Sequence, residues 1–237
     1  MKFSPLTLLS NLFDSWRAYM AEFFGTYILV LISLGLVLVS NLYQNLDPLA
    51  IALSLGFLYA ALIYATVHLS GGYLNPAVCL SLWFVKKLSG IKTIFFIAAQ
   101  LLASFAAAAS AYYIFGKKSL DFGLGISVIA PDKLQIAIIL ELIFTAFLVF
   151  AVFATMIDRS GPVSFGPLVI GLITVPLTLF ALPVSGAFLN PAKVLGAGII
   201  TKNYAPLTVG LIGPLTASLF AFIYNFIYLR RPGKPHS

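Results

Sequence analysis

The chain has 237 residues, of which 61% are hydrophobic and only 9% are charged. Soluble domains carry about 25% charged residues, so the composition excludes an ordinary water-soluble domain and predicts a surface that mostly faces lipid. The net charge of +7 does not indicate a nucleic-acid partner, because the basic residues are scattered among the breaks between apolar segments, where they report membrane topology.

Six apolar segments are candidates for membrane-spanning helices, which need roughly 20 mostly apolar residues. In chain order they are residues 18–39, 49–67, 92–115, 135–157, 166–182 and 206–229. Two further apolar segments, residues 76–85 and 191–200, would make helices of about 15 Å, half of the ~30 Å hydrocarbon core. We therefore expect an all-α membrane protein with six transmembrane helices and two half-helices.

Each half-helix follows the motif Ser-Gly-x-x-Leu-Asn-Pro-Ala, which occurs at residues 70–77 and again at residues 185–192. The copies end in Asn75, Pro76 and Ala77 and in Asn190, Pro191 and Ala192. Asparagine is a preferred helix N-cap and proline suits the first helical position, so both copies predict a helix start. The loop before each start is tolerated at membrane depth only inside the protein or beside a wet cavity. We therefore expect the two half-helices to meet at their N-termini around such a cavity.

The two halves of the chain read as repeats of each other. Matching positions are Glu22 with Glu141, Thr26 with Thr145, and Gly56 with Gly171. Each half has three spans and one half-helix, and because three is odd, the second half must enter the membrane from the opposite side. The sequence thus predicts a single channel domain over residues 1–237. It would contain an inverted-topology repeat, with repeat 1 at about 18–116 and repeat 2 at about 135–230.

The basic residues predict the orientation of this domain. With six full spans both termini lie on one side, which would carry Lys2, Arg17, Lys86, Lys87, Lys92, Arg159, Arg230, Arg231 and Lys234. The other side would carry only Lys117, Lys118, Lys133 and Lys202. Because loops rich in lysine and arginine stay in the cytoplasm, we expect both termini there, in a protein of the plasma (cell) membrane.

The chain resembles the major intrinsic protein family, the aquaporins and aquaglyceroporins. The resemblance is carried by residues 21–26, residues 68–71, both Asn-Pro-Ala motifs, and Gly213-Pro214 in the last span. It implies a homotetramer in lipid that passively conducts water and, as further candidates, small neutral solutes such as glycerol, urea or ammonia. The half-helix dipoles would place positive ends at mid-membrane, where they repel cations and protons but not neutral solutes.

Three ionisable residues need a role in such a protein. A carboxylate at membrane depth is by default a functional-site hypothesis, yet the resemblance implies that Glu22 and Glu141 have a structural role and accept hydrogen bonds from the loops before the half-helices. A proton relay is the alternative for both. The resemblance places His68 on the wall of the cytoplasmic vestibule, and the alternative is a hydrogen-bonded core histidine.

The resemblance also implies a selectivity filter at four positions, which are Leu55, Thr178, Ala187 and Lys193. Water-selective members have Phe, His, Cys and Arg there, and glycerol channels have Trp, Gly, Phe and Arg, so this chain matches neither set. Its smaller side chains predict a wider opening than that of a strict water channel. Lys193 keeps one cation without the planar donor fork of arginine, unless its side chain extends toward the vestibule instead.

The sequence contains no phosphate-binding glycine loop, metal-ligand cluster or nucleophile–base pair, so we expect no enzymatic activity, metal or cofactor. A passive channel is the favoured function, and two alternatives remain. A coupled secondary transporter can also have inverted repeats and broken helices, but its ion or proton site would have to come from Glu22, Glu141, His68 or Lys193. The other is a structural membrane protein whose tetramers adhere across cells with residual permeability.

Overall fold

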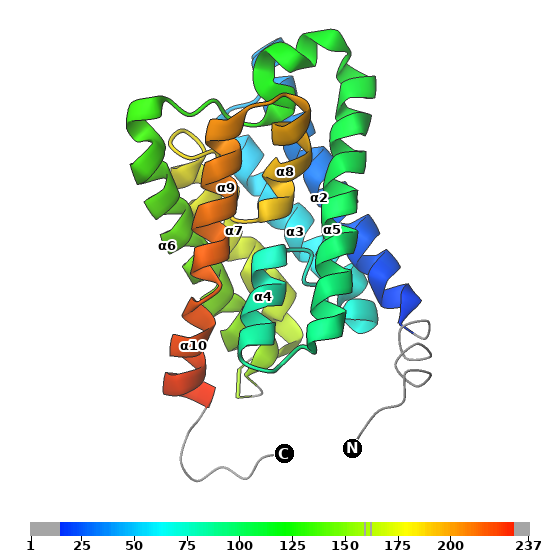
Figure 1. Cartoon of the computed structure of the whole chain (residues 1–237), viewed down its shortest axis with the longest axis vertical. Helices are drawn as coiled ribbons and strands as arrows, with labels where there is room; N and C mark the ends of the chain where they lie inside the picture. The colour runs from blue at the N-terminus through cyan, green and yellow to red at the C-terminus, as the bar shows by residue number, and fades with distance from the viewer. Residues whose placement is uncertain (1–14, 159, 162, 230–237) are drawn as a thin grey trace.

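The computed structural model describes residues 15–158, 160–161 and 163–229, and all regular elements within them are helical (Figure 1). The first half contains α2 (Trp16–Tyr43), α3 (Pro48–Ser70), α4 (Pro76–Phe84) and α5 (Gly90–Phe115). The second half contains α6 (Leu134–Val152), α7 (Gly166–Ala181), α8 (Pro191–Ile200), α9 (Tyr204–Ala217) and α10 (Phe220–Tyr224). Shorter 3₁₀ turns lie at Lys117–Gly125, Pro131–Lys133 and Val163–Phe165, and π-helical turns at Phe153–Ile157 and Asn225–Leu229. The prediction of an all-α membrane fold is confirmed.

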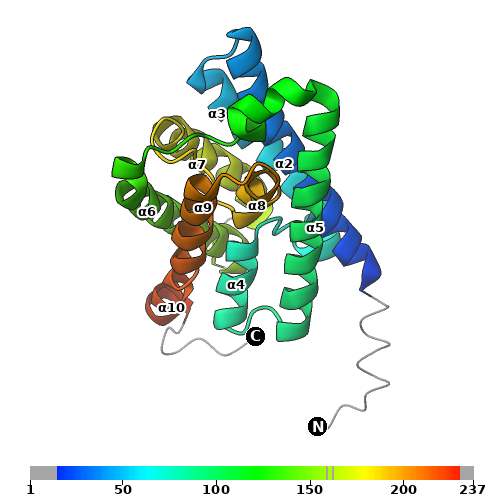
Figure 2. The same ribbon diagram turned by 45° about the horizontal axis from the view of Figure 1, so that its top comes forward.

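The two short helices α4 and α8 lie in the middle of the molecule and run in opposite directions from its centre (Figure 1). Figure 2 shows the same arrangement from a second angle, with the longer helices around them. The start of α2 and the end of α10 both lie at the lower end of the molecule in Figure 1. The ends of the described chain therefore share one face, as an even number of membrane crossings requires.

Helices α3 and α7 cross at two matching glycines of the repeats. A Cβ atom added to Gly56 would lie 2.7 Å from the carbonyl oxygen of Gly171, and one added to Gly171 would lie 2.5 Å from that of Gly56. Neither distance is sterically possible, so each backbone approaches the other at a point where only glycine fits. The two halves thus contact each other through equivalent residues.

One expected span is shorter than the others. Five described stretches are long and apolar enough to cross a membrane, namely Trp16–Tyr43, Pro48–Ser70, Gly90–Phe115, Pro131–Ile157 and Tyr204–Leu229. The segment expected at 166–182 forms α7, which has 16 residues and is therefore about 24 Å long. The 3₁₀ turn Val163–Phe165 precedes it. Residues 166–182 thus form a helix, but one that is shorter than the ~30 Å hydrocarbon core.

The last span, expected as one helix over 206–229, is interrupted. Pro214 lies inside α9, and a proline removes one helical hydrogen bond and crowds the preceding turn. The helix ends at Ala217 and resumes at Phe220 as α10. The hydroxyl of Ser81 in α4 lies 3.3 Å from the carbonyl oxygen of Ser218 in this interruption. The break therefore supplies a carbonyl group that helps to hold α4.

Apart from Lys193 at the central cavity, the described lysines and arginines belong to segments near the two ends of the molecule. Where α2 begins, α4 leads into α5 (Figure 1), and these segments contain Arg17, Lys86, Lys87 and Lys92. The turns after α5, before α6 and between α8 and α9 lie toward the opposite end (Figure 1), and they contain Lys117, Lys118, Lys133 and Lys202. The charge excess predicted for the first face depends on Lys2, Arg159, Arg230, Arg231 and Lys234, which lie outside the described residues.

Candidate functional site

Both Asn-Pro-Ala motifs form helix N-caps at the centre of the molecule. The Asn75 side-chain oxygen accepts the backbone N–H of Ala77, and the Asn190 oxygen accepts that of Ala192, each at 2.9 Å. Pro76 and Pro191 occupy the first positions of α4 and α8. The start of α8 is also tied to α5, because the Ser104 hydroxyl donates to the Ala192 carbonyl. These local interactions are the ones that the sequence motif predicts.

The same two asparagines join the halves of the protein. Asn75 Nδ2 donates to the carbonyl oxygen of Leu189 at 2.9 Å, and Asn190 Nδ2 donates to that of Leu74 at 2.8 Å. A carboxamide NH₂ group has two donor hydrogens, so each asparagine keeps a second one. Each side chain therefore caps its own half-helix and binds the loop of the other repeat.

Leu74 and Leu189 adopt an unusual backbone conformation to make these contacts. Their φ angles are 51° and 55°, in the left-handed region that bulky side chains rarely occupy. The N–H of Leu74 donates to Glu22 at 2.7 Å, and that of Leu189 donates to Glu141 at 2.6 Å. Each leucine is thus fixed at its N–H by the glutamate of its own repeat and at its carbonyl by the asparagine of the other.

The carboxyl group of Glu22 is fully buried and accepts four hydrogen bonds. Its Oε1 atom accepts the Ser70 hydroxyl at 2.6 Å and the Tyr73 N–H at 3.0 Å. Its Oε2 atom accepts the Leu74 N–H and the side-chain amide of Gln100, each at 2.7 Å. Because two of these donors are backbone N–H groups of the loop before α4, the carboxyl group supplies partners for loop backbone that is buried away from water.

Glu141 has the matching position in the second repeat. It is also fully buried and accepts the Ser185 hydroxyl at 2.6 Å and the N–H groups of Phe188 and Leu189 at 2.8 and 2.6 Å. Gly213 of α9 packs against it so closely that an added Cβ atom would lie 2.6 Å from the Glu141 Cβ atom. Within the described part of the chain, no side-chain amide donates to Glu141 as Gln100 does to Glu22.

A small cavity lies where the two half-helices meet. Six of its lining residues form matching pairs from the two repeats, Leu29 with Leu148, Tyr59 with Thr174, and Asn75 with Asn190. The others are Leu55, Phe188, Leu189 and Lys193. The volume open to the centre of a water-sized sphere is about 20 Å³, and one water needs about 10–15 Å³ on this measure. The cavity is therefore about one water molecule in size and combines apolar walls with a few polar groups.

Three of the four expected filter residues come together beside this cavity. Leu55 and Lys193 line it, and Lys193 Nζ donates to the carbonyl oxygen of Ala187 at 2.7 Å. The lysine side chain is therefore held inside the structure. Thr178 is fully buried and is not among the lining residues, and its hydroxyl has no hydrogen-bond partner within the described part of the chain. Thr174, one turn earlier in α7, lines the cavity instead.

The wide opening expected from the small filter residues concerns the extracellular constriction and stays a prediction, whereas the cavity at the half-helix ends is narrow. The aromatic side chains of Tyr59 and Phe188 belong to the cavity wall, and only about 20 Å³ between the walls is open to the centre of a water-sized sphere. Tyr59 and Thr174 were not identified from the sequence as cavity-lining residues, although two features of the sequence point to them. Tyr59 lies four residues after Leu55, which places both on one helix face, and Thr174 follows Tyr59 by the same 115 residues that separate the two motifs.

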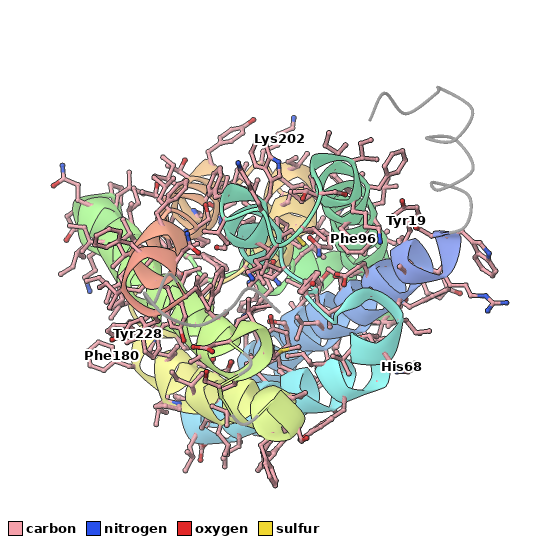
Figure 3. The ribbon with its side chains drawn as sticks, turned by 90° about the horizontal axis from the view of Figure 1, so that it is seen from below. Tyr19, His68, Phe96, Phe180, Lys202 and Tyr228 are labelled. Carbon is pink, nitrogen blue, oxygen red and sulfur yellow. The ribbon has the colours of Figure 1, made fainter. Side chains whose placement is uncertain are left out.

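His68 does not lie near the cavity. It belongs to the last turn of α3, where its side chain is exposed, and Figure 3 shows it at the outer edge of the molecule. It follows the cavity-lining Tyr59 by nine residues, which is about two and a half helical turns, so the two point to opposite faces of α3. The cavity lies where the half-helices meet and not in the cytoplasmic vestibule, so the vestibule-lining role of His68 stays a prediction.

Comparisons with known proteins find the same architecture and motifs elsewhere. Residues 10–224 match the family model described as Major intrinsic protein. The lens fiber major intrinsic protein of Lithobates pipiens is 33% identical over 225 residues, which cover 92% of this chain and 84% of that protein. Aquaporin-4 of Mus musculus is 31% identical over 222 residues, which cover 90% of this chain and 68% of that protein. The X-ray structure of the aquaglyceroporin from Plasmodium falciparum has a similar fold, with a TM-score of 0.76, 23% identity, and coverage of 90% of this chain and 96% of that one.

Proposed function

The chain belongs to the major intrinsic protein family, and we propose that it forms a passive transmembrane pore for water and small uncharged solutes. One observation carries the proposal: the N-termini of α4 and α8 meet at a water-sized cavity lined by Asn75 and Asn190. Each asparagine has one amide hydrogen beyond the one used for the opposite loop,. These hydrogens can bind a passing solute that accepts hydrogen bonds.

Charge at the centre supports selection for neutral solutes. A helix N-terminus carries about half a positive charge, and two such ends lie beside the cavity. The ammonium group of Lys193 adds a further positive charge at its wall. A cation entering this low-dielectric region would be repelled by all three groups. A water molecule carries no net charge and meets no such electrostatic barrier.

The contacts of the buried carboxyl groups argue against a coupled transporter. A proton-coupling site needs a group that is free to exchange its proton along the pathway. Glu22 and Glu141 instead each accept at least three hydrogen bonds from the loops and neighbouring side chains. We propose that both residues are structural and that the protein has no catalytic activity.

The assembly and membrane orientation follow from the family and the charge pattern. We propose a homotetramer in the cell membrane with both termini in the cytoplasm. The described chain begins and ends on one face (Figure 1), and the sequence assigns more basic residues to that face than to the other,. An epitope tag at either terminus should be protected from antibody in intact cells and accessible after permeabilisation.

Osmotic measurements on the reconstituted protein test the pore. Stopped-flow light scattering of proteoliposomes should show a higher water permeability than that of protein-free liposomes, with a temperature dependence close to that of water diffusion in bulk. A permeability and temperature dependence like those of the lipid alone would falsify the proposal. A solute uptake that an imposed pH gradient drives against the solute's own gradient would establish the coupled transporter instead.

A further inference from the structure

The wall of the midplane cavity departs from the internal symmetry of the chain at one matching pair. The other two pairs are chemically identical, Leu29 with Leu148 and Asn75 with Asn190. The third pair consists of Tyr59 on α3 and Thr174 on α7. A phenol ring therefore stands on one side of the cavity where the other side has only a small hydroxyl residue.

We propose that Tyr59 is a specificity-determining residue, whose ring sets the upper size of the solutes that pass the midplane. The four filter positions named from the family resemblance would then be secondary in setting this limit. The inference rests on the proposed pore function and adds to it a residue that limits size. It predicts a pore that conducts water well and retards polyols.

Tyr59 is held firmly at the cavity. Its side chain is 4% exposed, and its hydroxyl donates to the carbonyl oxygen of Tyr73 at 3.3 Å. It packs in the same apolar cluster as Leu29 and Leu148, so the ring is supported on its sides as well as at its tip. A ring fixed in this way cannot move aside for a larger solute without breaking a hydrogen bond and disturbing packed neighbours.

The hydroxyl contact also ties the ring to the loop before α4. Tyr73 belongs to that loop, its N–H is bonded to Glu22, and its carbonyl oxygen accepts from Tyr59. Glycerol, with three hydroxyl groups, needs several hydrogen-bond partners to replace its hydration, and a narrow passage leaves little room for them. The Tyr59 side chain thus disfavours glycerol by its volume.

The most direct test of this role is Tyr59→Thr, because it gives the first repeat the residue that the second repeat has at the matching position, Thr174. The matched control is Tyr64→Thr. Tyr64 lies on the same helix, its hydroxyl likewise donates to a backbone carbonyl, that of Ser164 at 3.2 Å, and its side chain is 46% exposed on the outer surface. Water and glycerol permeabilities of proteoliposomes containing each protein are measured by light scattering.

Tyr59→Thr should raise the ratio of glycerol to water permeability by about tenfold, which corresponds to a barrier lower by about 1.4 kcal/mol. Tyr64→Thr should leave that ratio at the wild-type value. If Tyr59→Thr does not assemble, Tyr59→Leu keeps apolar volume at the site and should give a smaller increase in the same direction. An unchanged ratio in an assembled Tyr59 variant, or an equal increase in Tyr64→Thr, would overturn the inference.

Two further variants separate the causes. Tyr59→Phe keeps the ring and removes the hydroxyl, so it should retain most of the discrimination if volume dominates. Thr178→Ala reduces the side chain of a filter residue that does not line the cavity, and it should change the ratio less than Tyr59→Thr; a larger effect would assign the size limit to the filter. A wild-type protein without water conduction would reject the pore itself, whereas water conduction with unchanged selectivity in the Tyr59 variants would reject only this inference.

Discussion

At the scale of single residues, Glu22 and Glu141 determine whether the loops before the half-helices keep their shape. Both carboxyl groups are fully buried, and their partners include two backbone N–H groups in each repeat. They therefore stabilise the protein through the number of hydrogen-bond donors that they satisfy rather than through their charge. This is the basis for the proposal that both residues are structural.

Replacing Glu22 by Gln should destabilise the protein less than replacing it by Leu. Glutamine keeps one acceptor oxygen, whereas leucine leaves four donors without their partner, at about 1–3 kcal/mol for each buried donor that stays unpaired. Thermal unfolding in detergent checks the order, and the same comparison at Glu141 should show a smaller loss because three donors are involved. Leucine variants at both sites that unfold at the wild-type temperature would contradict the structural role.

Lys193 allows the source of charge exclusion to be tested. Lys193→Met removes the ammonium group and leaves the Ala187 carbonyl without its donor, but it does not change the N-termini of α4 and α8. We therefore expect water conduction to persist and proton leakage to stay at the level of the wild type, because the midplane dipoles remain. A pH-sensitive dye inside proteoliposomes measures the leak. A clear rise in proton flux would show that the lysine, and not the helix ends, provides the barrier.

At the scale of elements, the crossing of α3 and α7 depends on the absence of side chains. Gly56→Ala and Gly171→Ala each place a Cβ atom within 2.7 Å of the opposite backbone, and overpacking of this kind costs about 1–3 kcal/mol. Because the two sites touch, their effects should not add. Thermal unfolding of both single variants and the double variant checks both statements.

A matched control for this crossing lies in α2. A Cβ atom added to Gly35 would have its nearest neighbour, the ring of Phe115, at 3.8 Å, which is ordinary van der Waals contact. Gly35→Ala should therefore leave stability unchanged or raise it slightly, since alanine favours helix over glycine by about 1 kcal/mol. Equal losses at Gly35 and Gly56 would mean that helix glycines are needed for some reason other than close approach.

At the scale of the whole molecule, the two repeats stabilise each other's loops. Asn75→Ala should weaken the cap of α4 by about 0.5–2 kcal/mol and also free the carbonyl group of Leu189 in the other half. We expect faster backbone hydrogen exchange in residues 185–192, measured by mass spectrometry, and the reciprocal effect in residues 70–77 for Asn190→Ala. Exchange that changes only within the mutated repeat would refute this coupling.

The sequence predicted the parts of this architecture that depend on local chemistry. Asn75 and Asn190 were identifiable as caps because the cap, the proline and the loop before them are neighbours in the chain. The side of α3 on which His68 lies and the place of Tyr59 at the cavity depend instead on how helices are rotated and packed. Composition gives little information about helix rotation, since both the buried and the lipid-facing sides of these helices are mostly apolar. The internal repeat was the signal that could have exposed Tyr59, through its partner Thr174.

The hydrogen bond between Asn190 and the carbonyl group of Leu74 affects the order in which the chain can fold during synthesis. This carbonyl group finds its partner, Asn190, 116 residues later in the sequence, so a ribosome must synthesise the second repeat as far as its own Asn-Pro-Ala motif before the first loop can be completed. Until then the carbonyl group of Leu74 lacks this partner. Domains commonly fold from the N-terminus onward during synthesis. In this chain the loop before the first half-helix completes its hydrogen bonds only when Asn190 of the second half is in place.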